Sequence, residues 1–271
     1  MPVTGPGRLN DAGPESVYGP DFFARVDASA QASAEQILPL VLGPLAPHSV
    51  ADVGCGSGIW LAEAARLGVE DYLGIDGHTP AESLRIPAER FLLHDLTAPL
   101  RLERRFDLVL CLEVAEHLPP DAADVLIESL VRLGPTVLFS AAVPNQGGDR
   151  HLNEQWPDYW AERFERHGRV AVDALRPLIW TNASVAWWYR QNALVFCEPG
   201  AVERVRAVSE NAAGEDGRRL ALVHPILHLW MSHQRDLLAE EVARERSLRE
   251  VVEMLRPAVA KAVSRRLRRP A

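Results

Sequence analysis

The stretch Val50-Ala-Asp-Val-Gly-Cys-Gly-Ser-Gly58 decides the fold of this chain. It starts with the short apolar run of a buried strand and then places Gly54, Gly56 and Gly58 at alternate positions. Apolar residues from Trp60 to Leu67 follow at helical spacing. A strand that enters a helix through a glycine-rich turn opens an open α/β sheet, whose ligands bind at the carboxyl ends of the strands.

Strands and helices alternate outward from this unit. Short apolar runs predict strands at Ser49–Val53, Asp71–Ile75, Phe91–Leu93, Phe106–Leu112, Thr136–Ala142, Val170–Leu175 and Asn192–Cys197. Helical spacing predicts helices at Asp21–Leu45, Trp60–Leu67, Asp121–Leu133 and Trp156–His167. We therefore expect a doubly wound, Rossmann-like α/β sheet covered by helices on both faces.

The glycine spacing and three acids point to one kind of ligand. Ile59 stands where a dinucleotide-binding turn would have its third glycine, which disfavours a dehydrogenase. Asp52 precedes the glycines and can meet a cation, while Asp76 ends the next strand and suits the hydroxyls of a ribose. Asp95 ends the third strand and, with the Leu96 amide, suits an adenine. S-adenosylmethionine has all three features.

On these residues the chain resembles class I S-adenosylmethionine-dependent methyltransferases. Asp52–Gly58 matches the glycine motif of that family, Asp76 its ribose acid and Asp95-Leu96 its adenine motif, and the likeness covers about residues 17–200. It also includes Phe106–Pro119, the segment around the fourth strand. The resemblance implies a seven-stranded sheet with an antiparallel last strand. It further implies that backbone near Leu112 and Glu113 holds the methionine part of the cofactor.

A narrower resemblance concerns the acceptor. Ser140–Trp160 and Ile179–Asn192 resemble a bacterial methyltransferase subgroup encoded near glycosyltransferases, in surface-polysaccharide or glycosylated natural-product pathways. This resemblance implies a small-molecule acceptor, with a sugar or glycoside hydroxyl as the leading candidate.

Residues after the fifth strand form the predicted acceptor site. Asn153, Trp156 and Tyr159, joined by Tyr189 from before the last strand, offer polar groups on an aromatic wall, which suits a sugar. The structural alternative makes Asn153 the N-cap of the following helix, with Glu154 favouring the helix dipole. For the Trp187–Tyr189 segment, core packing is the alternative.

Methyl transfer to a hydroxyl needs a base, because a neutral alcohol is a weak nucleophile. We predict His151 as that base, since histidine titrates near neutral pH, and Glu154 as the second candidate. His117 and His94 are further candidates, but His94 lies in the adenine motif and His117 starts a helix, where a histidine more often orients a loop. A metal-assisted variant would use Asp149, His151 and Glu154, but this spacing matches no recognised metal pattern, so we predict no metal site.

Composition excludes several other classes. The only lysine is Lys261, so a P-loop or a Schiff-base enzyme is excluded. The net charge of −8 argues against nucleic acid as a partner. Three widely spaced cysteines form no disulfide framework, and we expect a cytoplasmic protein.

Three regions follow from the pattern. We expect a mobile leader at 1–16, a methyltransferase domain at 17–200, and a helical extension at 201–271 with helices at Leu220–Leu238 and Leu248–Leu267. The extension ends in a basic tail containing Arg256, Lys261, Arg265, Arg266, Arg268 and Arg269. This tail has three alternative roles: packing on the domain, forming a homodimer, or lying on the inner membrane surface.

We therefore predict an O-methyltransferase that acts on a sugar-like small molecule. A carboxylate or amine methyltransferase is the alternative within enzymes, with Arg150, Arg176 and Arg190 as candidate clamps for a carboxylate. A non-catalytic cofactor-binding partner protein is the alternative from a different class.

Overall fold

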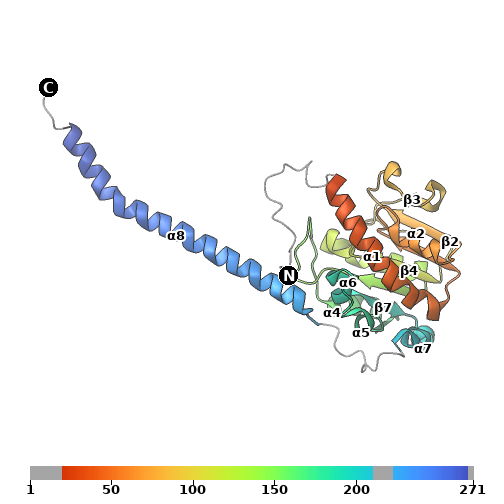
Figure 1. Cartoon of the computed structure of the whole chain (residues 1–271). Coiled ribbons are helices and arrows are strands. Elements are labelled where there is room, and N and C mark those ends of the chain that lie inside the picture. The colour runs from red at the N-terminus through yellow and green to blue at the C-terminus, as the bar shows by residue number, and fades with distance from the viewer. Residues whose placement is uncertain (1–19, 210–221, 268–271) are drawn as a thin grey trace. The chain divides into compact units, whose positions relative to one another are not determined.

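The computed structural model describes residues 20–209 and 222–267 (Figure 1). The described residues form two units, one ending at Leu227 and the other starting at His228. The leader predicted at 1–16 lies outside the described residues.

The first unit is built on a seven-stranded sheet with the order β3-β2-β1-β4-β5-β7-β6. Every adjacent pair is parallel except those of β7, which runs antiparallel to both β5 and β6. The strands are β1 Ser49–Val53, β2 Asp71–Asp76, β3 Phe91–Leu93, β4 Leu108–Leu112, β5 Thr136–Ser140, β6 Val170–Val172 and β7 Leu194–Cys197. This topology confirms the predicted fold class, including the antiparallel last strand.

Helices cover both faces of the sheet, and each face has its own apolar core. On one face α1 and α2 pack with α5, α6 and α7, and on the other α3 and α4 pack around Phe139 of β5. The helices of this unit are α1 Pro20–Leu45, α2 Ile59–Arg66, α3 Ala123–Leu133, α4 Pro157–Arg166, α5 Arg176–Ile179, α6 Trp187–Asn192 and α7 Val202–Arg206. Because both faces are buried, the strands are apolar at nearly every position, as β4 and β5 show.

Two predicted boundaries near the end of the first unit are wrong. The last strand was expected from Asn192, but Asn192 ends helix α6 and β7 begins at Leu194. The sixth strand was expected to reach Leu175 but ends at Val172. Short apolar runs fit a buried helix as well as a strand, so periodicity alone does not separate them.

The second unit contains most of one long helix, α8, which runs from Pro225 to Leu267 (Figure 1). The sequence predicted two separate helices here, and this is wrong because the helix runs without a break through residues 239–247; it also continues through Pro257, which lies inside the second predicted helix. A proline inside a helix removes one backbone hydrogen bond without necessarily ending the helix. Among the described residues, no helix is both long and apolar enough to cross a membrane.

Candidate functional site

The site lies at the carboxyl ends of the central strands. The strand order reverses between β1 and β4, since β2 and β3 extend the sheet to one side and β5 to the other. Such a reversal opens a crevice in which α/β sheets bind ligands. The residues that follow β1, β2 and β4 therefore face one region, and so does the loop after β5.

The glycine turn after β1 has a backbone that only glycine adopts easily. Gly54, Gly56 and Gly58 all have positive φ, at 81°, 53° and 83°. A Cβ on Gly54 would lie 2.3 Å from a methyl group of Val114, so a side chain there is excluded. The turn is fixed to β2, because the Gly56 amide donates to Asp76 Oδ2 at 3.0 Å.

Asp52 is buried beneath this turn. It is 2% exposed, and its Oδ2 has no hydrogen-bond partner in the part of the chain that the structure describes. Burial, with a smaller contribution from the nearby Asp76 carboxylate, raises the pKa of Asp52 to about 8. A buried acceptor without a donor is costly, and a bound cation with N–H groups would satisfy it.

Asp76 and Asp95 stand at the ends of β2 and β3, as the sequence indicated. Asp76 accepts backbone hydrogen bonds through both oxygens, from Gly56 and from His78 at 2.9 Å. Asp95 is exposed, and its Oδ1 accepts hydrogen bonds from the amide and hydroxyl of Thr97, which lower its pKa. Leu96 beside it is buried.

Glu113 follows Leu112 at the end of β4 and is the centre of a polar network. It has a positive φ of 54°, and its amide donates to the Ser140 hydroxyl. Its two carboxylate oxygens accept from Gln146 Nε2 and Asn192 Nδ2, each at 3.1 Å. Burial raises the pKa of Glu113 in spite of these hydrogen bonds. Sequence reasoning missed Gln146 and Asn192, because no sequence spacing joins the end of β4 to the loop after β5 and to the end of α6.

Glu116 is the other residue that the sequence analysis missed. It lies in the 3-10 turn Ala115–His117 after β4, and its side chain is 0% exposed. Among the described residues, neither carboxylate oxygen has a hydrogen-bond partner. Burial and the charge of Glu113 raise the pKa of Glu116 well above its usual range. The signal in the sequence was a glutamate–histidine pair directly after a strand end.

The loop after β5 is organised by Glu154. Its Oε2 accepts the Asn145 amide at 2.7 Å, and its Oε1 accepts the Gly147 amide at 2.9 Å. Oε1 also lies 2.8 Å from His151 Nδ1. Glu154 therefore fixes both the loop and the orientation of the His151 ring, and it has little capacity left to act as a base itself.

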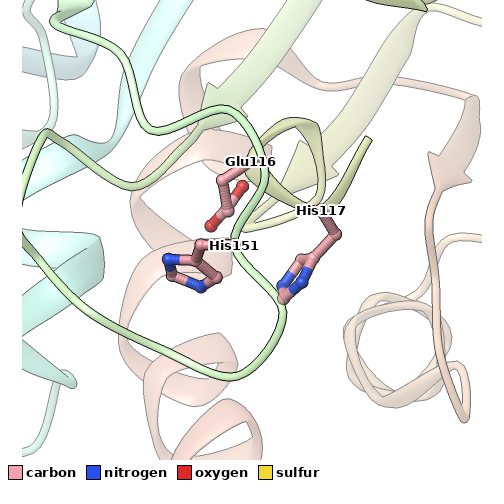
Figure 2. A group of neighbouring side chains, drawn as sticks. All are labelled: Glu116, His117 and His151. Carbon is pink, nitrogen blue, oxygen red and sulfur yellow. The ribbon is translucent and has the colours of Figure 1, made fainter. Parts of the chain in front are cut away.

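The same loop brings His151 to the turn after β4. The rings of His117 and His151 meet edge to face at 4.9 Å between centroids. The Glu116 carbonyl accepts the amides of Leu152 and Asn153, which ties the two segments together. Two histidines and a buried glutamate thus lie side by side (Figure 2).

The predicted acceptor residues separate into two groups. Trp156 is 42% exposed and, with Tyr159 and polar neighbours, lines an open hollow of about 520 Å³ on the described surface of the first unit. Asn153 is buried, and its Oδ1 accepts from Gln155 instead of capping α4, whose N-cap is Trp156. Tyr189 is buried as well and packs edge-on against Trp60, as the core-packing alternative expects.

The comparisons with known proteins agree with this architecture. Residues 26–180 match the family model described as "Methyltransferase domain". The ubiquinone biosynthesis O-methyltransferase of Acinetobacter baylyi is 37% identical over 108 residues, which are 36% of this chain and 45% of that protein. The ubiquinone biosynthesis O-methyltransferase of Albidiferax ferrireducens is 36% identical over 112 residues, which are 36% of this chain and 43% of that protein. This chain thus spans less than half the length of these curated relatives.

Among solved structures, DesVI of Streptomyces venezuelae has the same fold. It superposes with a TM-score of 0.50 at 14% identity and covers 69% of this chain and 99% of its own. The magnesium protoporphyrin IX methyltransferase of Synechocystis PCC 6803, solved with bound SAH, has a TM-score of 0.46 at 19% identity, with shares of 71% and 88%. The family match covers more than half of the chain and confirms the predicted class, an S-adenosylmethionine-dependent methyltransferase domain. The chain therefore belongs to the methyltransferase domain family.

Proposed function

We propose that this protein transfers the methyl group of S-adenosylmethionine to a hydroxyl oxygen of a small molecule. The observation that carries the proposal is the meeting, at one end of the sheet, of a glycine turn over an unpartnered buried acid and an oriented imidazole. When bound, S-adenosylmethionine supplies an electrophilic methyl group on a sulfonium.

The strand ends fit the parts of this cofactor. Asp52 Oδ2 lacks a donor, and the ammonium of the methionine part would supply one. A Cβ on Gly56 would meet nothing within 4 Å, so this glycine leaves the turn open to a close ligand. Asp76 would bind the ribose, Asp95 and the Leu96 amide the adenine, and the backbone of Leu112 and Glu113 the methionine part.

His151 would prepare the acceptor oxygen. If its Nδ1–H donates to Glu154, its Nε2 keeps a lone pair that can take the hydroxyl proton. The new O–C bond then forms as the S–C bond breaks, and the electron pair stays on sulfur. Most of the acceleration would come from holding the oxygen, the methyl carbon and sulfur in line. Glu154 acts through His151, so we assign it a positioning role.

A sugar-like acceptor is supported by the hollow beside the loop after β5. Its lining combines the exposed faces of Trp156 and Tyr159 with the polar side chains of Gln155, Asp158 and Glu162. An aromatic wall with a few polar groups suits a carbohydrate ring. Oxygen as the accepting atom is also supported by the curated relatives, which are named as O-methyltransferases. The link to glycosylated natural products stays a proposal.

A carboxylate acceptor is less well supported. It would need an arginine clamp, and of the three candidates only Arg150 is exposed, in the loop after β5. The side chain of Arg176 is 1% exposed and pairs with Asp173 at 2.7 Å. Arg190 is also buried and donates to the Trp180 carbonyl at 3.4 Å.

The experiment is an acceptor screen with methyl-labelled S-adenosylmethionine and a panel of glycosides, phenols and carboxylic acids. We expect label on a hydroxyl compound, and a loss of turnover of roughly a hundred- to ten-thousandfold in His151→Ala. His167→Ala, which changes an exposed histidine at the end of α4, is the matched control. Label found only on carboxylates, or normal turnover in His151→Ala, would contradict the proposal.

A further inference from the structure

The starting point is the Glu116 carboxylate, which has no role in the cofactor site. It is fully buried, and neither oxygen has a hydrogen-bond partner among the described residues. Polar groups in such positions are nearly always paired, and a carboxylate that stays ionised there needs a nearby cation. Among the described residues no arginine lies close enough to act on this carboxylate, so a bound cation would supply the missing positive charge.

Two histidines complete a set of donors around this carboxylate. One ligating atom each from Glu116, His117 and His151 can be chosen so that all lie within 4.8 Å of one another. Figure 2 shows that they come from two separate loops, the turn after β4 and the loop after β5. Two ligands of one ion lie at most about 4.4 Å apart, because metal–ligand bonds are about 2.0–2.2 Å long, so the 4.8 Å limit leaves only a few tenths of an ångström for the side chains to close on an ion.

The His151 ring is oriented by a carboxylate on the side away from the proposed ion, as is common for histidines that bind a metal. Its Nδ1 contacts the Glu154 carboxylate at 2.8 Å, which leaves Nε2 for another partner. Metal-bound histidines very often have such a carboxylate behind them, which fixes the tautomer. A Cβ on Gly148 would lie 2.2 Å from His151 Nε2, so the ring takes its position only because residue 148 is glycine.

We propose that Glu116, His117 and His151 bind one divalent first-row transition ion, such as Mn²⁺, Fe²⁺, Co²⁺ or Zn²⁺. Two imidazoles and one carboxylate favour these ions over Mg²⁺ and Ca²⁺, which prefer oxygen ligands throughout. The prediction of no metal site rested on the spacing of Asp149, His151 and Glu154. The set proposed here joins an adjacent pair to a histidine more than thirty residues later, a pattern that spacing does not reveal.

The ion deepens the proposed function, on which this part of the inference rests. Three protein ligands leave coordination positions open, and the acceptor oxygen can take one of them. An oxygen bound to a divalent ion loses its proton more easily, and the proton passes to water. The deprotonated acceptor oxygen would then be able to take the methyl carbon while the S–C bond breaks and its electron pair stays on sulfur. His151 is then a ligand of the ion, and the ion does the work assigned above to the free imidazole.

Metal binding can be measured without any acceptor. The full chain is stripped with a chelator, dialysed and titrated with Co²⁺, with the visible ligand-field absorption as the signal and calorimetry with Zn²⁺ and Mn²⁺ alongside. We expect one equivalent to bind. Glu116→Gln keeps the shape of the side chain but removes the anionic ligand. Losing a residue that only supports a ligand from behind typically weakens metal binding by roughly 10–100-fold, so losing a ligand itself should weaken it by at least that much.

Two more variants and a control sharpen the test. His151→Ala should also lose the ion, and Glu154→Gln should weaken it by about 10–100-fold, because it removes the partner behind the histidine. His167→Ala should bind like the wild type. Binding of SAH to each variant shows that the fold is intact.

The outcomes separate this inference from the proposed function. No saturable Co²⁺ binding, or equal binding in Glu116→Gln and the wild type, overturns the metal site. One bound equivalent that Glu116→Gln loses supports it, even if the acceptor screen finds no hydroxyl substrate. In that case the proposed function fails and the metal site stands.

Discussion

Replacing Asp52 by asparagine should stabilise the cofactor-free protein and weaken cofactor binding. Asp52 is buried under the glycine turn, and its pKa is raised to about 8. At neutral pH the folded state therefore holds a proton that the unfolded chain has released. Asparagine has nearly the same shape and no such proton, so the variant avoids this cost.

The magnitude follows from the two pKa values. Between an unfolded value of about 3.9 and a folded value of about 8, the cost to the folded state at pH 7 is about 4 kcal/mol. The asparagine amide leaves a polar group in the same unsatisfied place, which costs about 1–3 kcal/mol. We expect a net gain of about 1–3 kcal/mol, or a rise in Tm of at least about 2 °C.

The sign of the pH dependence is specific. The pKa of Asp52 is raised in the folded state. Its contribution to the stability of the wild type is therefore most favourable below pH 4 and is lost as the pH rises toward 8. The advantage of Asp52→Asn should therefore be absent near pH 4 and grow up to about pH 8. Thermal unfolding of both proteins without cofactor across this pH range measures it.

Asp71→Asn is the control of opposite sign. Asp71 pairs with Arg104 and Arg90 at the start of β2, and the hydrogen bond from Arg104 lowers its pKa. This group stabilises the folded state above its unfolded pKa, so the variant should be less stable than the wild type at neutral pH, with the gap closing as the pH falls. An Asp52→Asn protein that is no more stable than the wild type at pH 7, with the same pH profile, would refute the buried, protonated Asp52.

Three further predictions concern the acceptor, the tail and the core. Trp156→Ala should raise the KM for a sugar acceptor without changing SAH affinity, and an unchanged KM in steady-state kinetics would remove the hollow from the acceptor site. If the basic tail lies on membranes, the full chain should co-sediment with anionic vesicles, release with added salt, and lose this binding when truncated after Arg256. Equal sedimentation of both proteins would leave packing or dimerisation as its role. Phe164→Ala should cost about 3–5 kcal/mol in urea unfolding, because Phe164 is buried and stacks on Phe196 at 3.9 Å, whereas a loss below 1 kcal/mol would show a loosely packed core.

Local pattern was enough to predict the sheet and the places of the glycine turn, Asp76 and Asp95 at its strand ends. Strands β1 and β3 have the predicted bounds, because each is a short apolar run with a clear stop signal on either side. The glycine turn, Asp76 and Asp95 lie at strand ends, where parallel strands bring them together. Periodicity failed at the boundary between α6 and β7, where Asn192 ends the helix and was predicted to start the strand.

The acceptor end of the site was harder to predict, because long-range contacts create it. Glu116 meets His151 only because the loop after β5 folds back and donates two amides to the Glu116 carbonyl. Asn153 has the residue type of an N-cap, but this loop buries it away from the helix start. Sequence spacing carries no record of such contacts, so the three-residue set at Glu116, His117 and His151 became visible only in three dimensions.

The most direct test of the account is calorimetric titration of the full chain with SAH. We predict one bound SAH per chain and no heat from NAD⁺. In Asp76→Ala the affinity for SAH should fall about ten- to a hundredfold, because each lost hydrogen bond to a charged acceptor is worth roughly 1.5–3 kcal/mol. A wild-type protein that binds no SAH, or an Asp76→Ala protein that binds it as tightly as the wild type, would contradict the cofactor site at the ends of β1, β2 and β3.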